Sequence, residues 1–138
     1  VGPENLHFLP VPFAQLRDYM ELYDVKWIVS WSRRGRGYFD AYPEYFQRTR
    51  DIGRFRIYEV SRPHNAFLKG QGLVAASYNR IVVQNAVAER GKVVLKYHWV
   101  DGMRCKPDCR AEPYPVSDDP TGFIQVIGPD ASFEILFP

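Results

Sequence analysis

The sequence has no apolar run that approaches the roughly 18 residues of a membrane-spanning helix, because polar residues interrupt every hydrophobic segment. It shows no secretory signal pattern of a basic start, an apolar block and a small-residue cleavage site. Internal repeats and low-complexity tracts are also lacking. The opening VGPENLHFLPVPF carries no initiator Met, which favours a piece of a larger protein over a cytosolic one.

The chain also lacks a strong excess of positive or negative charge. The chain has 18 Lys and Arg against 16 Asp and Glu, a formal net charge of +2. A charge this small does not predict a nucleic-acid or membrane-surface partner by bulk attraction. At 138 residues the chain is long enough for one ordinary domain with its own core.

Cysteine is limited to Cys105 and Cys109, in the stretch CKPDC. A zinc site would need two more ligands, and none of the three histidines forms an H-x₃₋₅-H pair. Three residues separate the cysteines, whereas a thioredoxin-type pair has two, and Pro107-Asp108 favours a turn. A local disulfide is therefore the favoured interpretation, with free thiols and metal binding as alternatives. No cofactor is indicated.

The order of apolar and turn residues predicts an α+β fold. Residues 1–63 form an N-terminal α/β segment, and residues 64–138 form an antiparallel β-sandwich packed with it as one structural unit. The expected elements are a helix over 13–23, a buried strand over 24–31, a basic glycine-broken loop over 32–37 and a short helix that begins near Pro43 and ends before Gly53. Strands are expected over 54–60, 72–78, 80–87, 92–100, 122–128 and 132–137.

Two groups of residues are candidates for ligand contact. Arg33, Arg34 and Arg36 could bind phosphate or single-stranded nucleic acid, although a solvated loop is the favoured interpretation because nearby acids dilute their charge. The aromatic side chains of Tyr97, Trp99 and Tyr114 could stack on a sugar, although core packing explains most aromatic residues.

Catalytic residues are not identified. Paired carboxylates are what glycoside hydrolysis needs, and six acids lie between residues 18 and 51. All six fall on predicted helix faces or turns, where acids are normally solvated. These acids are Asp18, Glu21, Asp24, Asp40, Glu44 and Asp51. His64 and His98 have no nucleophile motif beside them.

Several phrases in chain order resemble the soluble C-terminal tail of bacterial multi-spanning membrane proteins of the glycosyltransferase-C-like class. The matching phrases are LYDVKWIVSW over 22–31, GRFRIYEV over 53–60, NRIVV over 79–83, VVLKYHWVDG over 93–102, FIQV over 123–126 and SFEILF over 132–137. The match covers roughly residues 14–137, and it departs from the usual proline-glycine-tryptophan order within 97–102.

This resemblance implies a non-catalytic accessory domain on the extracytoplasmic face of a bacterial cell membrane. Its partners would be the transmembrane region of the same protein and a saccharide or lipid-linked saccharide, and no nucleic acid is expected. A disulfide fits that compartment. A glycan-active hydrolase domain is the first alternative function, and a nucleic-acid-binding module is the second.

Overall fold

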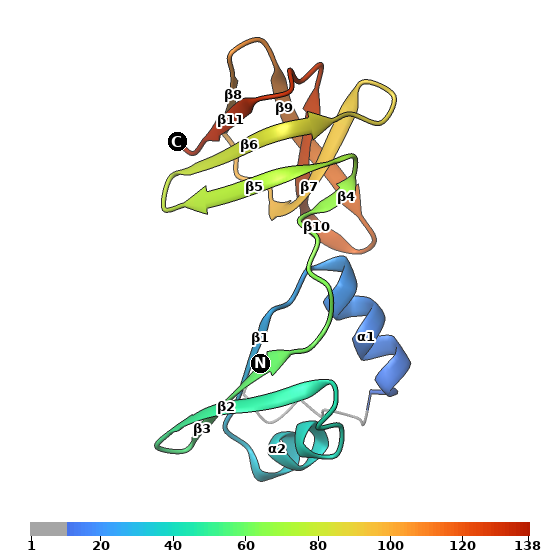
Figure 1. Ribbon diagram of the computed structural model, residues 1–138, viewed down its shortest axis with the longest axis vertical. Coiled ribbons are helices and arrows are strands. Elements are labelled where there is room, and N and C mark those ends of the chain that lie inside the picture. The colour runs from blue at the N-terminus through green and yellow to red at the C-terminus, as the bar shows by residue number, and fades with distance from the viewer. Residues whose placement is uncertain (1–10) are drawn as a thin grey trace. The chain divides into compact units, whose positions relative to one another are not determined.

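The structure is a computed structural model that describes residues 11–138. The chain divides into two compact units, with the boundary between His64 and Asn65. We call them the first unit and the second unit and describe each by itself. The described chain is mostly β structure in antiparallel sheets, with two short helices (Figure 1). Neither helix has the length and hydropathy that a membrane-spanning segment requires.

The first unit holds both helices and one three-stranded antiparallel sheet in the order β1-β3-β2. Its elements are α1 Phe13–Leu22, β1 Trp27–Ser30, α2 Arg33–Asp40, β2 Phe46–Ile52 and β3 Phe55–Val60. The expected helix over 13–23 and the expected strand over 54–60 are confirmed. Periodic apolar residues on α1 and strict alternation on β3 account for these two successes.

The basic stretch is a helix, and the segment after Pro43 is a strand, so both expectations for 32–53 were wrong. Ser32 caps α2, because its hydroxyl accepts a bond from the Gly35 N–H at 2.9 Å. Gly53 adopts a φ of +57° in the β2–β3 turn and does not end a helix. Hairpin pairing with β3 fixes β2 as extended chain, which local propensity alone did not reveal.

The core of the first unit lies between the helices and one face of the sheet. Met20, Phe46, Tyr58 and Val60 are buried there, and Phe39 of α2 packs against them. A Cβ on Gly35 would lie 2.6 Å from Ser30 Oγ, so glycine allows α2 to approach β1 closely. Two glycines in RRGRG, which suggest a loop, are therefore compatible with a packed helix.

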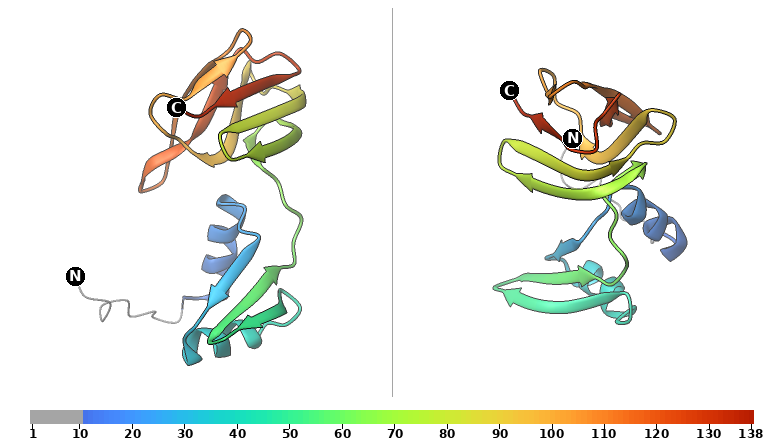
Figure 2. Two further views of the ribbon diagram at one scale, coloured as in Figure 1. Left: turned by 90° about the vertical axis from the view of Figure 1, so that its left-hand side faces the viewer. Right: turned by 45° about the horizontal axis from the view of Figure 1, so that its top comes forward.

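The second unit holds two four-stranded antiparallel sheets, in the orders β4-β7-β10-β9 and β5-β6-β11-β8. Figure 2 shows these sheets from two further directions. The strands are β4 Phe67–Lys69, β5 Gln71–Ser77, β6 Arg80–Val87, β7 Lys92–His98, β8 Arg104–Lys106, β9 Arg110–Val116, β10 Asp119–Ile127 and β11 Phe133–Leu136. All five strands expected in this region are present.

Three strands of the second unit were not predicted. β4 and β8 are only three residues long, and β9 contains Pro113 and Pro115. Proline cannot donate to a sheet ladder, and β9 lies at a sheet edge, where this is tolerated.

One buried cluster draws residues from both sheets of the second unit. Leu95 and Ile124 come from the first sheet, and Val83 and Ile135 from the second. β4 and β5 join the two sheets through Gly70, whose φ is +81°. A Cβ there would lie 2.8 Å from the Val87 carbonyl oxygen, so this crossing point needs glycine.

Candidate interaction surface

One face of the three-stranded sheet carries large apolar side chains and lies opposite the helix-packed core. Directly paired residues of antiparallel strands share a face, and Val29 pairs with Ile57, while Phe55 pairs with Ile52. We call this surface the open face. Its residues are Trp27, Val29, Gln47, Arg50, Ile52, Phe55, Ile57 and Glu59. Trp31 follows the end of β1 by one residue, and the alternation of Trp27 and Val29 places it on the same face.

The apolar residues of the open face are unusually exposed. Trp27, Val29, Trp31, Ile52 and Phe55 have exposed fractions between 39% and 57%. A shallow depression of about 540 Å³ lies among Trp27, Val29, Thr49, Arg50 and Ile57. An antiparallel sheet with one covered face normally presents polar residues on the other. A contiguous apolar patch there marks a contact surface.

The expectation that residues 24–31 form a strand is confirmed, but the expectation that it is buried on both faces was wrong. Ser30 is buried and Ile28 is half-buried, whereas Trp27 and Val29 are exposed. Composition alone predicted burial, because apolar residues occupy both faces of this strand. The alternation from Trp27 to Trp31 was the signal that one face could be open, and sequence reasoning did not use it.

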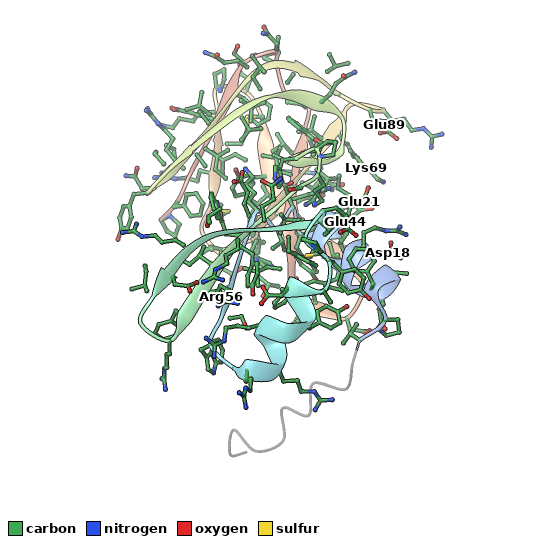
Figure 3. The ribbon with its side chains drawn as sticks, turned by 60° about the horizontal axis from the view of Figure 1, so that its bottom comes forward. Asp18, Glu21, Glu44, Arg56, Lys69 and Glu89 are labelled. Carbon is green, nitrogen blue, oxygen red and sulfur yellow. A yellow bond between two sulfur atoms is a disulfide. The ribbon has the colours of Figure 1, made fainter. Side chains whose placement is uncertain are left out.

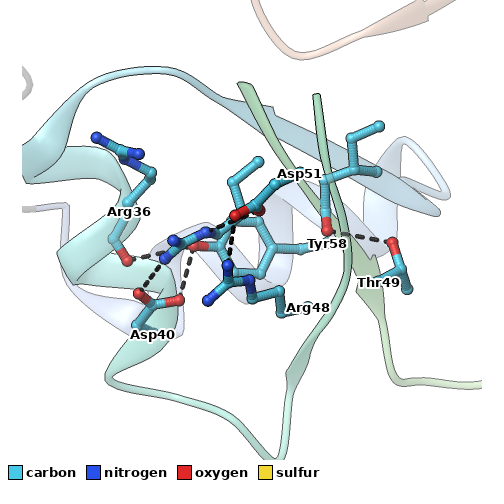
Figure 4. A network of polar contacts seen from close by, with 8 residues as sticks. Arg36, Asp40, Arg48, Thr49, Asp51 and Tyr58 are labelled. Carbon is cyan, nitrogen blue, oxygen red and sulfur yellow. Dashed lines mark hydrogen bonds and ion pairs between the residues drawn. The ribbon is translucent and has the colours of Figure 1, made fainter. Parts of the chain in front are cut away.

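The opposite, helix-packed side of the sheet carries a network of ion pairs (Figure 4). Arg56 of β3 donates to Asp40 Oδ2 at 2.7 Å and to Asp51 Oδ1 at 3.1 Å. Arg48 donates to the other oxygen of Asp51. The Tyr58 hydroxyl donates to Asp40 Oδ1 at 2.8 Å. These contacts join the end of α2 to β2 and β3.

The contacts of this network shift the pKa values of Asp51 and Tyr58. Loss of hydration opposes ionisation of Asp51, but the bonds from Arg56 and Arg48 outweigh it and lower the pKa of this carboxyl. Burial raises the pKa of Tyr58, and its bond to Asp40 adds to the rise. A general acid needs a raised carboxyl pKa, so Asp51 is poorly suited to that role.

The three aromatic residues predicted to contact a sugar are not brought together on one face. Tyr97 and Trp99 are half-buried and pack against the core cluster of the second unit. Tyr114 pairs with Phe123, and the next residue of β10, Ile124, belongs to that cluster. Alternation therefore places Tyr114 on the face away from the cluster.

Trp99 and Tyr114 each contact a polar side chain of the second unit. The Trp99 Nε1–H donates to Asp101 Oδ1 at 2.9 Å. The Lys69 ammonium lies 5.1 Å from the centre of the Tyr114 ring. Their polar tips and ring faces are thus partly occupied by protein groups.

The predicted basic residues lie on α2 and not on a loop. Arg33 and Arg34 are exposed at its first turn, and Arg36 is half-buried one turn later. The Tyr58 hydroxyl lies 3.4 Å from the backbone carbonyl oxygen of Arg36.

The predicted disulfide between Cys105 and Cys109 is confirmed. The two Cα atoms lie 5.3 Å apart, and the bond closes the turn between β8 and β9. Both cysteines pack beside the core cluster of the second unit. The bond therefore links the ends of β8 and β9, which are edge strands of the two different sheets.

The six acids considered for catalysis are dispersed. Asp18, Glu21 and Glu44 are exposed, and their side chains are labelled in Figure 3. Asp40 and Asp51 share Arg56 in the network above, and Asp24 pairs with Arg62 at 3.3 Å. Within residues 11–138, no group of three or more His, Cys, Asp or Glu side chains is arranged to hold a metal ion.

Comparison with protein-family models, with curated proteins and with solved structures finds no match to this chain.

Proposed function

We propose that this chain is a non-catalytic accessory domain on the extracytoplasmic face of a multi-pass, glycosyltransferase-like membrane protein, and that it acts by contact. The main support is the open face, because a cluster of exposed apolar residues is typical of a surface that contacts another protein or a membrane. We propose that its partner is the transmembrane region of the same protein, together with the membrane around that region.

Three further features support this role. The Cys105–Cys109 bond suits an oxidising compartment. The order of phrases along the chain resembles the soluble tails of such proteins. The acids considered for glycoside hydrolysis are exposed or held in ion pairs, which favours an accessory role over a hydrolase. Within this proposal the two sheets of the second unit pack face to face as a sandwich around their shared cluster.

Saccharide contact is the second candidate role, and one observation favours a particular place for it. Trp27 lies in the open-face depression beside Arg50 and Thr49, so a ring face and a guanidinium lie within one concave surface. Tyr97, Trp99 and Tyr114 do not share a surface, and they are weaker candidates for the same role.

The natural reading frame and the thiols test the main proposal. We expect several apolar segments of about 20 residues upstream of residue 1 and no free thiols in protein from its natural source. A reading frame limited to this chain, together with reduced cysteines, would overturn it.

Calorimetric titration with cell-envelope saccharides tests the second role. Trp27→Ala should abolish binding and Trp99→Ala should preserve it. Absence of binding by the unaltered chain, or loss with Trp99→Ala alone, contradicts the assignment to the depression.

A further inference from the structure

The apolar and charged residues of the open face are unevenly distributed along it. One end lies at the β2–β3 turn and contains Trp31, Ile52 and Phe55, flanked by Arg50 and Arg54. The other end pairs Trp27 with Glu59 and Gln47. We call the first of these the hairpin end, and Figure 1 shows its turn projecting from the sheet.

The hairpin end joins two chemistries that suit a lipid surface. Its tryptophan and phenylalanine have large apolar rings, and tryptophan concentrates at membrane–water interfaces. Arginine side chains lay their stems along apolar surface while the guanidinium reaches phosphate. Arg54 already lies 5.4 Å from the centre of the Phe55 ring, so the cation lies directly beside the apolar group.

We infer that the hairpin end docks on an anionic phospholipid bilayer, with Trp31, Ile52 and Phe55 entering the interface and Arg50 and Arg54 binding lipid phosphates. The inference deepens the proposed function, because a domain tethered to a membrane protein works beside such a surface. Net charge does not drive this binding, since the whole chain carries only +2. The binding is driven by the local positive charge of Arg50 and Arg54 beside the apolar residues of the hairpin end.

Charge favours this partner over a second copy of the chain. A symmetric pairing of two hairpin ends would bring Arg50 and Arg54 close to the same residues of the other copy, and like charges repel. The aliphatic residues favour it over single-stranded nucleic acid. Bases stack on aromatic rings, whereas Ile52 and Val29 gain most from contact with hydrocarbon.

Vesicle sedimentation with the 138-residue chain tests the inference. Vesicles of phosphatidylglycerol and phosphatidylcholine in equal parts are compared with vesicles of phosphatidylcholine alone. We expect binding to the anionic vesicles to be stronger by on the order of tenfold. Arg50→Glu with Arg54→Glu should remove this preference, and Trp31→Ser with Phe55→Ser should abolish binding to both kinds of vesicle.

Matched controls come from the second unit. Tyr78 is fully exposed, and Arg90 and Lys92 are exposed beside the β6–β7 turn. Tyr78→Ser and the pair Arg90→Glu with Lys92→Glu should leave vesicle binding unchanged. Circular dichroism of every variant distinguishes loss of contact from loss of fold.

Fluorescence gives a second measurement. The chain has three tryptophans, and Trp99→Phe leaves Trp27 and Trp31 as the reporters. Anionic vesicles should shift their emission to shorter wavelength as Trp31 leaves water.

Four results would overturn the inference. They are no vesicle binding, equal loss with the control variants, a dimer that Trp31→Ser with Phe55→Ser disperses, and binding of a single-stranded oligonucleotide without vesicle binding. None of these four depends on the upstream reading frame or on the thiols. Failure of the docking inference is thus distinguishable from failure of the accessory-domain proposal.

Discussion

The guanidinium of Arg56 on β3 donates to the carboxylate of Asp40, the last residue of α2, across 2.7 Å. The two residues are 16 positions apart in the sequence, so this bond exists only after the helix has packed on the sheet. It lies on the side opposite the open face. The residues that hold the first unit together are therefore separate from those that we propose to bind a partner.

The lowered pKa of Asp51 predicts acid sensitivity. Its carboxylate contributes stability above the ordinary carboxyl pKa of about 3.8, and that contribution is lost as the pH falls through the lower folded-state pKa. Asp51→Asn should therefore flatten the fall in stability as the pH drops below about 3.8. Thermal unfolding followed by circular dichroism across this range measures the slope.

Asp118 provides the control for this pH dependence, because it is an exposed aspartate of the second unit. Asp118→Asn should leave the slope unchanged. If the Asp51→Asn curve runs parallel to that of the unaltered chain, the carboxylate is not responsible for the acid sensitivity.

Two glycines of α2 should respond in opposite directions to alanine. Gly35→Ala places a Cβ 2.6 Å from Ser30 Oγ and should be destabilising, because α2 must move away from β1. Gly37→Ala meets nothing within 4 Å and should stabilise the helix by about 0.5–1 kcal/mol. Denaturant midpoints compare the two variants. Equal effects would mean that α2 does not approach β1 as closely as described.

The Asp24–Arg62 pair should be costly to break. Each side chain is only 9% exposed, and Arg62 also donates to the Met20 carbonyl oxygen at 2.7 Å. Asp24→Asn leaves the Arg62 charge buried and should destabilise the first unit by about 3 kcal/mol.

A double-mutant cycle separates this charge effect from packing. Asp24→Asn combined with Arg62→Met should cost less than the sum of the two single changes, since no unpaired charge is left. Additive costs in urea unfolding would show that the two side chains do not interact.

Removal of the disulfide should have a modest effect. Cys105→Ser with Cys109→Ser opens a loop of very few residues, and loop entropy predicts a loss of about 2 kcal/mol. Thermal unfolding of the double variant and of the reduced chain should agree. A complete loss of folding would show that β8 and β9 depend on the bond for more than loop closure.

Much of the secondary structure followed from periodicity alone. α1, β3 and the long strands of the second unit have regular apolar spacing, and their positions were predicted correctly. The segment from Arg33 to Ile52 was not, because its glycines suggest a loop and Pro43 suggests a helix start. Only pairing with β3 and packing against Ser30 select a helix followed by a strand.

The candidate site shows the same division. Trp27, Val29 and Trp31 were visible as apolar residues, but the sequence could not say which face of β1 the helices would cover. Tyr97, Trp99 and Tyr114 looked like one aromatic group, and the register of β10 separates them. Faces are assigned by contacts between residues far apart in the chain, and no short stretch contains that information.

By itself, the sequence predicted an α+β chain with most of its strands and favoured a local disulfide, because cysteine spacing and apolar alternation act over a few residues. The tertiary structure decided which apolar side chains are buried and which acids are neutralised by arginine. These outcomes depend on how helices and strands pack, since burial and ion pairing are properties of neighbours in space.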